Sequence, residues 1–244
     1  MDAKKVKSKI FNFFYYYKWH ILIVLFFVCI LTVLTVQLLT KEKYDIRVMY
    51  AGNAILSDED NAEFVEALKQ FGTDYNGDGK TTAEVFDLII MDEEQLQQAY
   101  EEGQNPYFLN QGTVNESRET FTFQSMASEY ALLFLSPDCY DLLKENGYVV
   151  PLDSYLEPVA EGQTENFSRY DEGAIRLNSL NISVFYNIFS KLPDDTLVCI
   201  KRVKATSKGN SDEEVNQKNH IEILKKMIAF ELPADFVLPG QNGG

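Results

Sequence analysis

The feature that most constrains the fold of this 244-residue chain is an apolar run near its N-terminus, residues 20–39. From Ile21 onward the run contains no charged side chain, and its polar or thiol side chains are few: Cys29, Thr32, Thr35 and Gln37. An α-helix rises about 1.5 Å per residue, so roughly 20 apolar residues span the ~30 Å core of a bilayer. A soluble helix of this length would carry a polar stripe. The run therefore predicts a transmembrane helix over residues 20–40.

The charges that flank this run predict its orientation. One acid, Asp2, and five lysines precede it: Lys4, Lys5, Lys7, Lys9 and Lys18. Two lysines follow it, Lys41 and Lys43, with Glu42 between them. Positive residues stay on the cytoplasmic side of a membrane. We therefore expect residues 1–19, a basic and aromatic segment, in the cytoplasm and the C-terminal domain outside the cell.

A cleaved signal peptide is the alternative interpretation of the same run. It would have a shorter apolar region and a small-x-small cleavage site, which neither residues 33–36 nor residues 37–41 provide. Cys29 follows Val28 rather than the small residue expected in a lipoprotein signal. We therefore expect an uncleaved signal anchor and a single-pass protein of the cell membrane.

The charge of the chain beyond the apolar run is strongly negative. The chain has 22 basic and 37 acidic residues, and its first 39 residues hold five Lys and one Asp, so 17 basic and 36 acidic residues remain. This acidity keeps an exposed domain soluble, and it repels nucleic-acid phosphates and anionic lipid headgroups. We expect no nucleic-acid partner.

Two cysteines, Cys139 and Cys199, lie beyond the apolar run. Two thiols can pair in an oxidising exterior, but no spacing indicates a disulfide scaffold or a metal site. A buried free cysteine behaves as a small apolar residue, and we favour that interpretation for both.

The patterning of residues 41–235 predicts strands that alternate with helices, which indicates an α/β domain with a largely parallel sheet. The predicted strands are 44–50, 85–91, 130–135 and 197–203, and the predicted helices are 57–72, 93–103, 136–147 and 213–230. Residues 104–120, rich in Gln, Asn and Gly, are predicted to be a loop, and residues 236–244 a flexible tail. About 200 residues suffice for one core and are compatible with two small lobes.

One short motif of the domain predicts a metal loop. Asp74, Asn76 and Asp78 alternate, Gly79 follows, and the carbonyl of Lys80 is the next expected ligand. Calcium takes six to eight oxygen ligands, and acidic or amide side chains at alternate positions converge on one point when a loop turns sharply. The motif resembles the calcium loop of EF-hands and dockerin modules and predicts structural calcium.

The motif departs from the EF-hand pattern at its twelfth position, where Val85 replaces a bidentate acid. Glu84 lies one position earlier and Asp87 two positions later. A plain turn is the alternative interpretation, because Asn-Gly and Asp-Gly pairs favour turns by themselves. The sequence does not say which residue would complete the metal site.

Catalytic motifs are mostly missing from the sequence. It contains no Gly-x-Ser-x-Gly, His-Glu-x-x-His, Ser-x-x-Lys or glycine-rich phosphate loop. The single histidine beyond the apolar run, His220, is expected to be solvated at the start of the last helix. An enzyme is therefore the weakest of three functional hypotheses, and we expect a non-catalytic protein.

The stretch 128–153 resembles part of an extracellular solute-binding protein of the type with two α/β lobes. In this stretch a strand ends at Ser136, a short helix follows, and Gly147 precedes Val150-Pro-Leu-Asp153. The lysine-rich start, the Tyr-Tyr-Lys-Trp-His segment and the single span also resemble membrane-anchored proteins of Firmicutes that often carry an Asp-x-Asn-x-Asp-Gly loop. The domain is short for two lobes, so the resemblance implies a reduced solute-binding fold.

Ligands of such α/β domains bind at the carboxyl ends of parallel strands. Asn53 and Ser136 would there offer hydrogen bonds, and Tyr50 an aromatic wall. The alternative, which we favour because Ser prefers N-cap positions, is that Ser136 caps its helix and Tyr50 packs in the sheet.

Two functional hypotheses follow. The first is a membrane-tethered extracellular binding module that recognises a small-molecule ligand or a partner at the cell surface. The second is a non-catalytic accessory subunit of a membrane protein complex, in which Thr32, Thr35 and Gln37 of the span contact a partner. A cleft with convergent polar groups favours the first, and a large exposed apolar patch favours the second.

Overall fold

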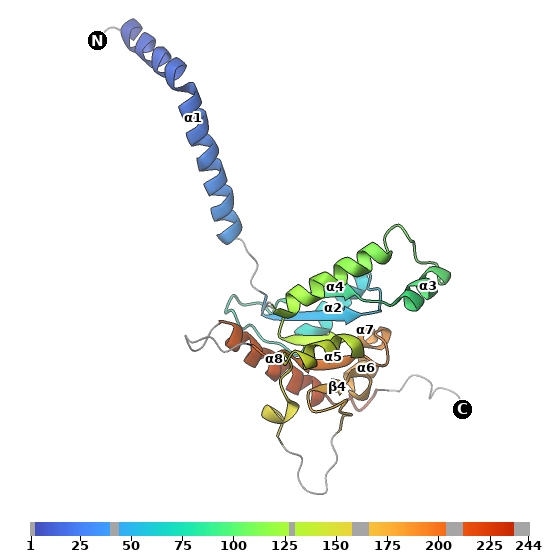
Figure 1. Ribbon diagram of the computed structural model, residues 1–244. Helices are drawn as coiled ribbons and strands as arrows, with labels where there is room; N and C mark the ends of the chain where they lie inside the picture. The colour runs from blue at the N-terminus through green and yellow to red at the C-terminus, as the bar shows by residue number, and fades with distance from the viewer. Residues whose placement is uncertain (1–2, 40–43, 127–129, 158–165, 204–211, 237–244) are drawn as a thin grey trace. The chain divides into compact units, whose positions relative to one another are not determined.

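The computed structural model describes residues 3–39, 44–126, 130–157, 166–203 and 212–236 (Figure 1). The chain divides into two compact units, Met1–Lys43 and Tyr44–Gly244.

The first unit contains one long helix, α1, which runs from Ala3 to Leu39. Its stretch Tyr15–Val36 is long and apolar enough to cross a membrane, as the sequence predicts; a signal sequence can have the same length and composition. The helix begins well before the apolar run, so the basic N-terminal segment is helical too. The hydroxyls of Thr32 and Thr35 donate to the carbonyls of Val28 and Leu31, at 2.8 and 2.7 Å, so both donors are satisfied within the helix.

The second unit is built on a mixed five-stranded sheet with the order β2-β1-β3-β5-β4. Its strands are β1 Ile46–Gly52, β2 Ala83–Ile89, β3 Leu132–Leu135, β4 Ala174–Arg176 and β5 Leu197–Ile200. The α/β class predicted from the sequence is confirmed. The strand bounds differ from the predicted ones by a few residues, as is usual for element ends.

The predicted largely parallel arrangement is correct for one half of the sheet and wrong for the other. β1 pairs in parallel with β2 and with β3. β5 pairs antiparallel with both β3 and β4. A short, fully buried strand such as β5 has the same apolar pattern whether it pairs parallel or antiparallel. Its antiparallel insertion between β3 and β4 was therefore not predictable from its residues.

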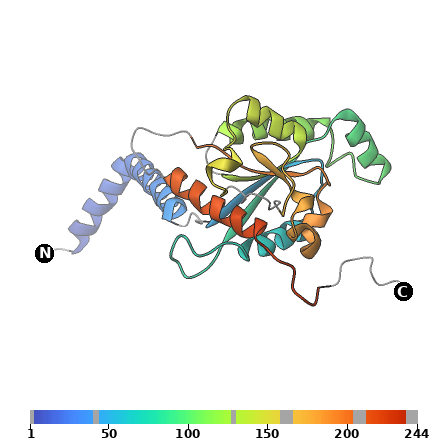
Figure 2. The same cartoon turned by 90° about the horizontal axis from the view of Figure 1, so that it is seen from below.

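Helices cover both faces of the sheet (Figures 1 and 2). They are α2 Asp58–Lys69, α3 Glu93–Glu101, α4 Gln111–Met126, α5 Pro137–Glu145, α6 Ile182–Phe185, α7 Asn187–Lys191 and α8 Asp212–Ile228, with 3₁₀ turns at Leu152–Ser154 and Leu177–Ser179. One face packs against α2, α7 and α8, where Phe64, Phe134 and Phe189 form the centre of the larger apolar cluster. The other face packs against α4 and α5.

Helix α4 corrects the prediction of a loop over residues 104–120. Only three of its side chains are buried, Val114, Phe121 and Ser125, so its apolar period is too sparse to be recognised in the sequence. The side chain of Asn110 accepts from the amides of Gly112 and Thr113 at 2.9 and 3.2 Å and caps the start of the helix. Tertiary packing of these few side chains against the sheet therefore decides this helix.

Candidate functional site

The carboxyl ends of three parallel strands meet at one edge of the sheet. β1 lies between β2 and β3. The amide of Ile90, after β2, donates to the carbonyl of Gly52 at 2.7 Å, and the amide of Ser136, after β3, donates to Ala51 at 2.9 Å. These bonds hold the three following loops side by side, at the place where α/β sheets bind ligands.

A concavity of about 140 Å³ opens between these loops. It is lined by Asn53 after β1, by Asp92 after β2 and by Ser136 and Asp138 after β3. The loops after β1, β2 and β3 thus lie around one hollow. α4 adds Arg118 and the connection before β5 adds Asp195, and the sequence signalled neither. Arg118 belongs to the segment predicted as a loop, and Asp195 carries no motif.

A second concavity, of about 330 Å³, adjoins the first and shares Asn53, Met91 and Gln95 with it. Its apolar lining comes from Ala54, Ile55, Leu56 and Ala99, and its polar lining from Asp60, Gln98, Glu102, Gln104 and Lys191. A volume of this size is in the range of small-molecule sites, and the exposed lining is more polar than apolar.

An ion pair borders the second concavity. Lys191 of α7 binds Asp60 of α2 and lies 3.5 Å from Glu63. The hydrogen bond to Lys191, with those to Ser57, holds the pKa of Asp60 well below its usual range, and the same bond raises the pKa of Lys191. The pair therefore stays charged and ties α2 to α7 beside the hollow.

The three ligand residues predicted from the sequence differ in their positions. Asn53 lines both concavities and Ser136 lines the smaller one. Tyr50 lines neither, because it is 1% exposed inside the sheet. Its hydroxyl accepts from the amide of Ala54 at 2.9 Å, and burial raises its pKa. Tyr50 therefore holds the loop after β1 by a hydrogen bond. It packs inside the sheet, as the alternative interpretation predicts, and does not form an aromatic wall of the site.

Ser136 stands at the N-cap of α5, but its side chain forms no cap hydrogen bond. Ser136 therefore occupies the N-cap position, as the alternative interpretation predicts, but its hydroxyl does not cap the helix. Pro137 follows in the first turn, where the missing amide hydrogen costs nothing.

The predicted metal loop folds around its own side chains. Asp74 accepts from the amides of Gly77, Asp78 and Gly79 at 2.6 to 3.1 Å. Asn76 accepts from Asp78, and Asp78 from Lys80, both at 2.9 Å. Gly77 and Gly79 have φ of 76° and 85°, a backbone region that favours glycine. The three alternating side chains thus hold a tight turn together by accepting from its backbone amides.

A buried acid that the sequence did not single out anchors this loop. The carboxylate of Asp45 accepts from the amides of Tyr75, Asn76 and Thr82 at 2.8 Å each and from the Thr82 hydroxyl at 3.0 Å. Asp45 immediately precedes β1, so its carboxylate fixes the loop to the start of this strand.

The donor set of the loop fits calcium only in part. Asp74, Asn76, Asp78 and the Lys80 carbonyl would supply four of the oxygens. The two acids near the twelfth position are used elsewhere, because Glu84 pairs with Arg47 at 3.2 Å and Asp87 accepts from Asn61 at 3.2 Å. Among the described residues no group of three His, Cys, Asp or Glu side chains could hold a metal. Calcium at this loop stays a prediction.

His220 is buried, contrary to the prediction that it is solvated. Its exposure is 0%. Its Nε2 accepts from the amide of Arg47 at 2.9 Å, and its Nδ1 lies 2.7 Å from the carbonyl of Asn216. Burial lowers its pKa, so the ring is neutral and joins α8 to the start of β1. This is a structural role, since both ring nitrogens are occupied by the backbone.

The two cysteines of this unit are free and buried, which confirms the interpretation from the sequence. Burial raises the pKa of the Cys139 thiol to about 11 and that of Cys199 further. Both therefore stay protonated and pack as small apolar side chains.

Comparison with known proteins adds no family to this description. No protein-family model, no curated protein and no solved structure matches the chain.

Proposed function

We propose that this chain is a membrane-tethered binding module whose α/β unit takes a small polar solute at the carboxyl ends of β1, β2 and β3. The observation that carries the proposal is the pair of adjoining concavities that share Asn53, Met91 and Gln95. Their linings combine aliphatic side chains with a larger share of amide and charged groups, which suits a polar solute. The tether is α1, with the N-terminus in the cytoplasm and the domain outside the cell.

Asn53 is the residue through which to test this proposal, because it lines both hollows. Asn53→Trp fills them with an indole, whereas Lys226→Trp places the same side chain on an exposed position of α8. The full-length protein in detergent is screened against a panel of small solutes by thermal denaturation. We expect stabilisation by at least one solute, lost in Asn53→Trp and kept in Lys226→Trp. An equal response in both variants would move the ligand away from this site.

A second candidate function, an accessory subunit of a membrane complex, is favoured by one observation. Tyr107 and Phe108, in the connection between α3 and α4, are 87% and 77% exposed. Two neighbouring exposed aromatic residues are the kind of anchor that protein interfaces bury. If this function holds, a membrane protein co-purifies with the full-length chain and is lost when both residues are changed to Ser. The solute panel should then produce no stabilisation.

A further inference from the structure

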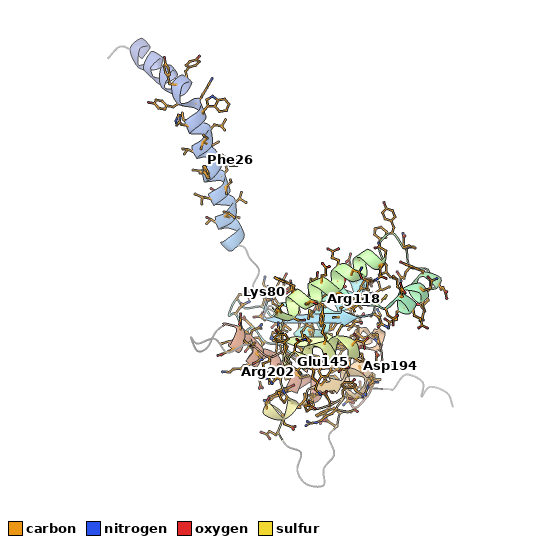
Figure 3. The ribbon with its side chains drawn as sticks, in the orientation of Figure 1. Phe26, Lys80, Arg118, Glu145, Asp194 and Arg202 are labelled. Carbon is orange, nitrogen blue, oxygen red and sulfur yellow. The ribbon has the colours of Figure 1, made fainter. Side chains whose placement is uncertain are left out.

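Three of the four charged side chains around the smaller concavity indicate the chemistry of its ligand, given the binding function proposed above; the fourth, Asp92, caps α3. Arg118 comes from α4, Asp138 from the first turn of α5 and Asp195 from the connection before β5. Figure 3 labels Arg118 on α4. In the part of the chain that the structure describes, none of the three forms an ion pair.

The positive group is held in place at this hollow. One terminal nitrogen of Arg118 donates to the carbonyl of Met91, which also lines the concavity. A guanidinium carries five N–H donors, so this bond leaves donors for another acceptor. Its planar fork matches a carboxylate, which it binds through two parallel hydrogen bonds.

The two negative groups act on the same small region. Burial is the main cause of the raised pKa of the Cys139 thiol; Asp138 raises this pKa further and Arg118 lowers it. Burial is also the main cause of the raised pKa of Tyr50, and the negative charge of Asp195 raises this pKa further. One guanidinium and three carboxylates, those of Asp138, Asp195 and the N-cap residue Asp92, therefore surround a hollow of about 140 Å³.

This arrangement disfavours simple anions and simple neutral solutes. The helices that start at this edge already carry their own acids at their N-termini, Asp60 in α2, Asp92 before α3 and Asp138 in α5, so their dipoles are compensated. A neutral solute would remove water from Arg118 and from the acids without offering them an opposite charge, which costs free energy. A ligand that carries both charges a short distance apart satisfies both sides.

We propose that the smaller concavity binds the zwitterionic head of a free α-amino acid, with its carboxylate on Arg118 and its ammonium on Asp138 and Asp195. An ammonium has three donors, and two carboxylates offer it enough acceptors. The larger concavity, which shares Asn53, Met91 and Gln95 with the smaller one, receives the amino-acid side chain. Its volume of about 330 Å³ and its mixture of aliphatic and amide groups suit a side chain of medium size.

The test is equilibrium dialysis of the full-length protein in detergent against individual isotope-labelled amino acids. The strongest binder is then compared with its α-amide, which lacks the carboxylate, and with its N-acetyl form, which lacks the ammonium. We expect both analogues to lose binding. Arg118→Gln, Asp138→Asn and Asp195→Asn should each weaken binding about tenfold or more, because each removes a charge-assisted hydrogen bond.

Asp194→Asn is the matched control, because Asp194 is the exposed neighbour of Asp195 and does not line the concavity. It should bind as the parent does, and melting curves of all variants establish that each is folded. Amino-acid binding that is unchanged in the three site variants would overturn the placement of the ligand. Binding of a neutral solute at Asn53, with no binding of any amino acid, would overturn this inference and leave the proposed function standing. If neither class binds, both fail.

Discussion

The buried neutral histidine predicts a stability that falls as the solution becomes acidic. The folded-state pKa of His220 is lowered from its ordinary value by burial, while in the unfolded chain it returns to about 6.5. The unfolded state therefore binds more protons below that pH. The contribution of the neutral ring is complete above pH ~6.5 and is lost as the pH falls toward the folded-state pKa, with a limiting slope of about 1.4 kcal/mol per pH unit.

The perturbation that isolates this effect is His220→Leu. It removes the acceptor that Nε2 offers to the amide of Arg47 at 2.9 Å. Leaving a buried donor without its acceptor costs about 1–3 kcal/mol, so the variant should be less stable than the parent near neutral pH. Because leucine does not titrate, the gap between parent and variant should narrow as the pH falls below ~6.5.

The assay is urea unfolding of the full-length protein in detergent, followed by circular dichroism over a series of pH values. The only other histidine of the chain, His20, lies in α1, so His20→Gln is the matched control and should keep the slope of the parent. Parallel stability curves for the parent and His220→Leu, or a parent that gains stability on acidification, would refute the reasoning.

Three further outcomes are expected. Protease added to intact cells, with any wall removed, should cleave off everything after about Lys43, and protection of the C-terminal domain would reverse the proposed orientation. Calcium at ten times its Kd should raise the free energy of unfolding by about 1.4 kcal/mol. Asp78→Ala should abolish that gain and leave calcium-free stability nearly unchanged, since Asp78 accepts only from the exposed amide of Lys80 in its loop; an equal calcium response in the variant would identify a plain turn. Gly52→Ala should destabilise the fold by about 1–3 kcal/mol in thermal melts, because its Cβ would lie 2.6 Å from the Tyr50 hydroxyl. Gly103→Ala meets no neighbouring atom but carries the strain of a positive φ of 97°, which Gly52 does not have, so the two variants report steric overlap and backbone strain separately.

The sequence by itself determined the features that depend on local chemistry. The apolar run indicated a helix long enough to span a membrane, and α1 contains it. The N-termini of α2 and α3 were set by Ser57 and Asp92, each of which forms a capping box with a side chain three residues later. The end of α5 was set by Asn146-Gly147, where Gly147 has φ of 72°. Each of these signals acts between residues that are neighbours in the chain.

Tertiary structure alone decided which of these elements meet. The antiparallel insertion of β5, the helical state of α4 and the burial of His220 depend on partners far away in sequence, such as the Arg47 amide, which is 173 residues from His220. The candidate site follows the same rule. The sequence indicated Asn53 and Ser136 because both follow predicted strands, but Arg118 and Asp195 join them only because α4 and the β5 connection fold over the same edge of the sheet. Local patterns fix where a segment turns and which face it buries, whereas long-range packing decides which charges face one hollow.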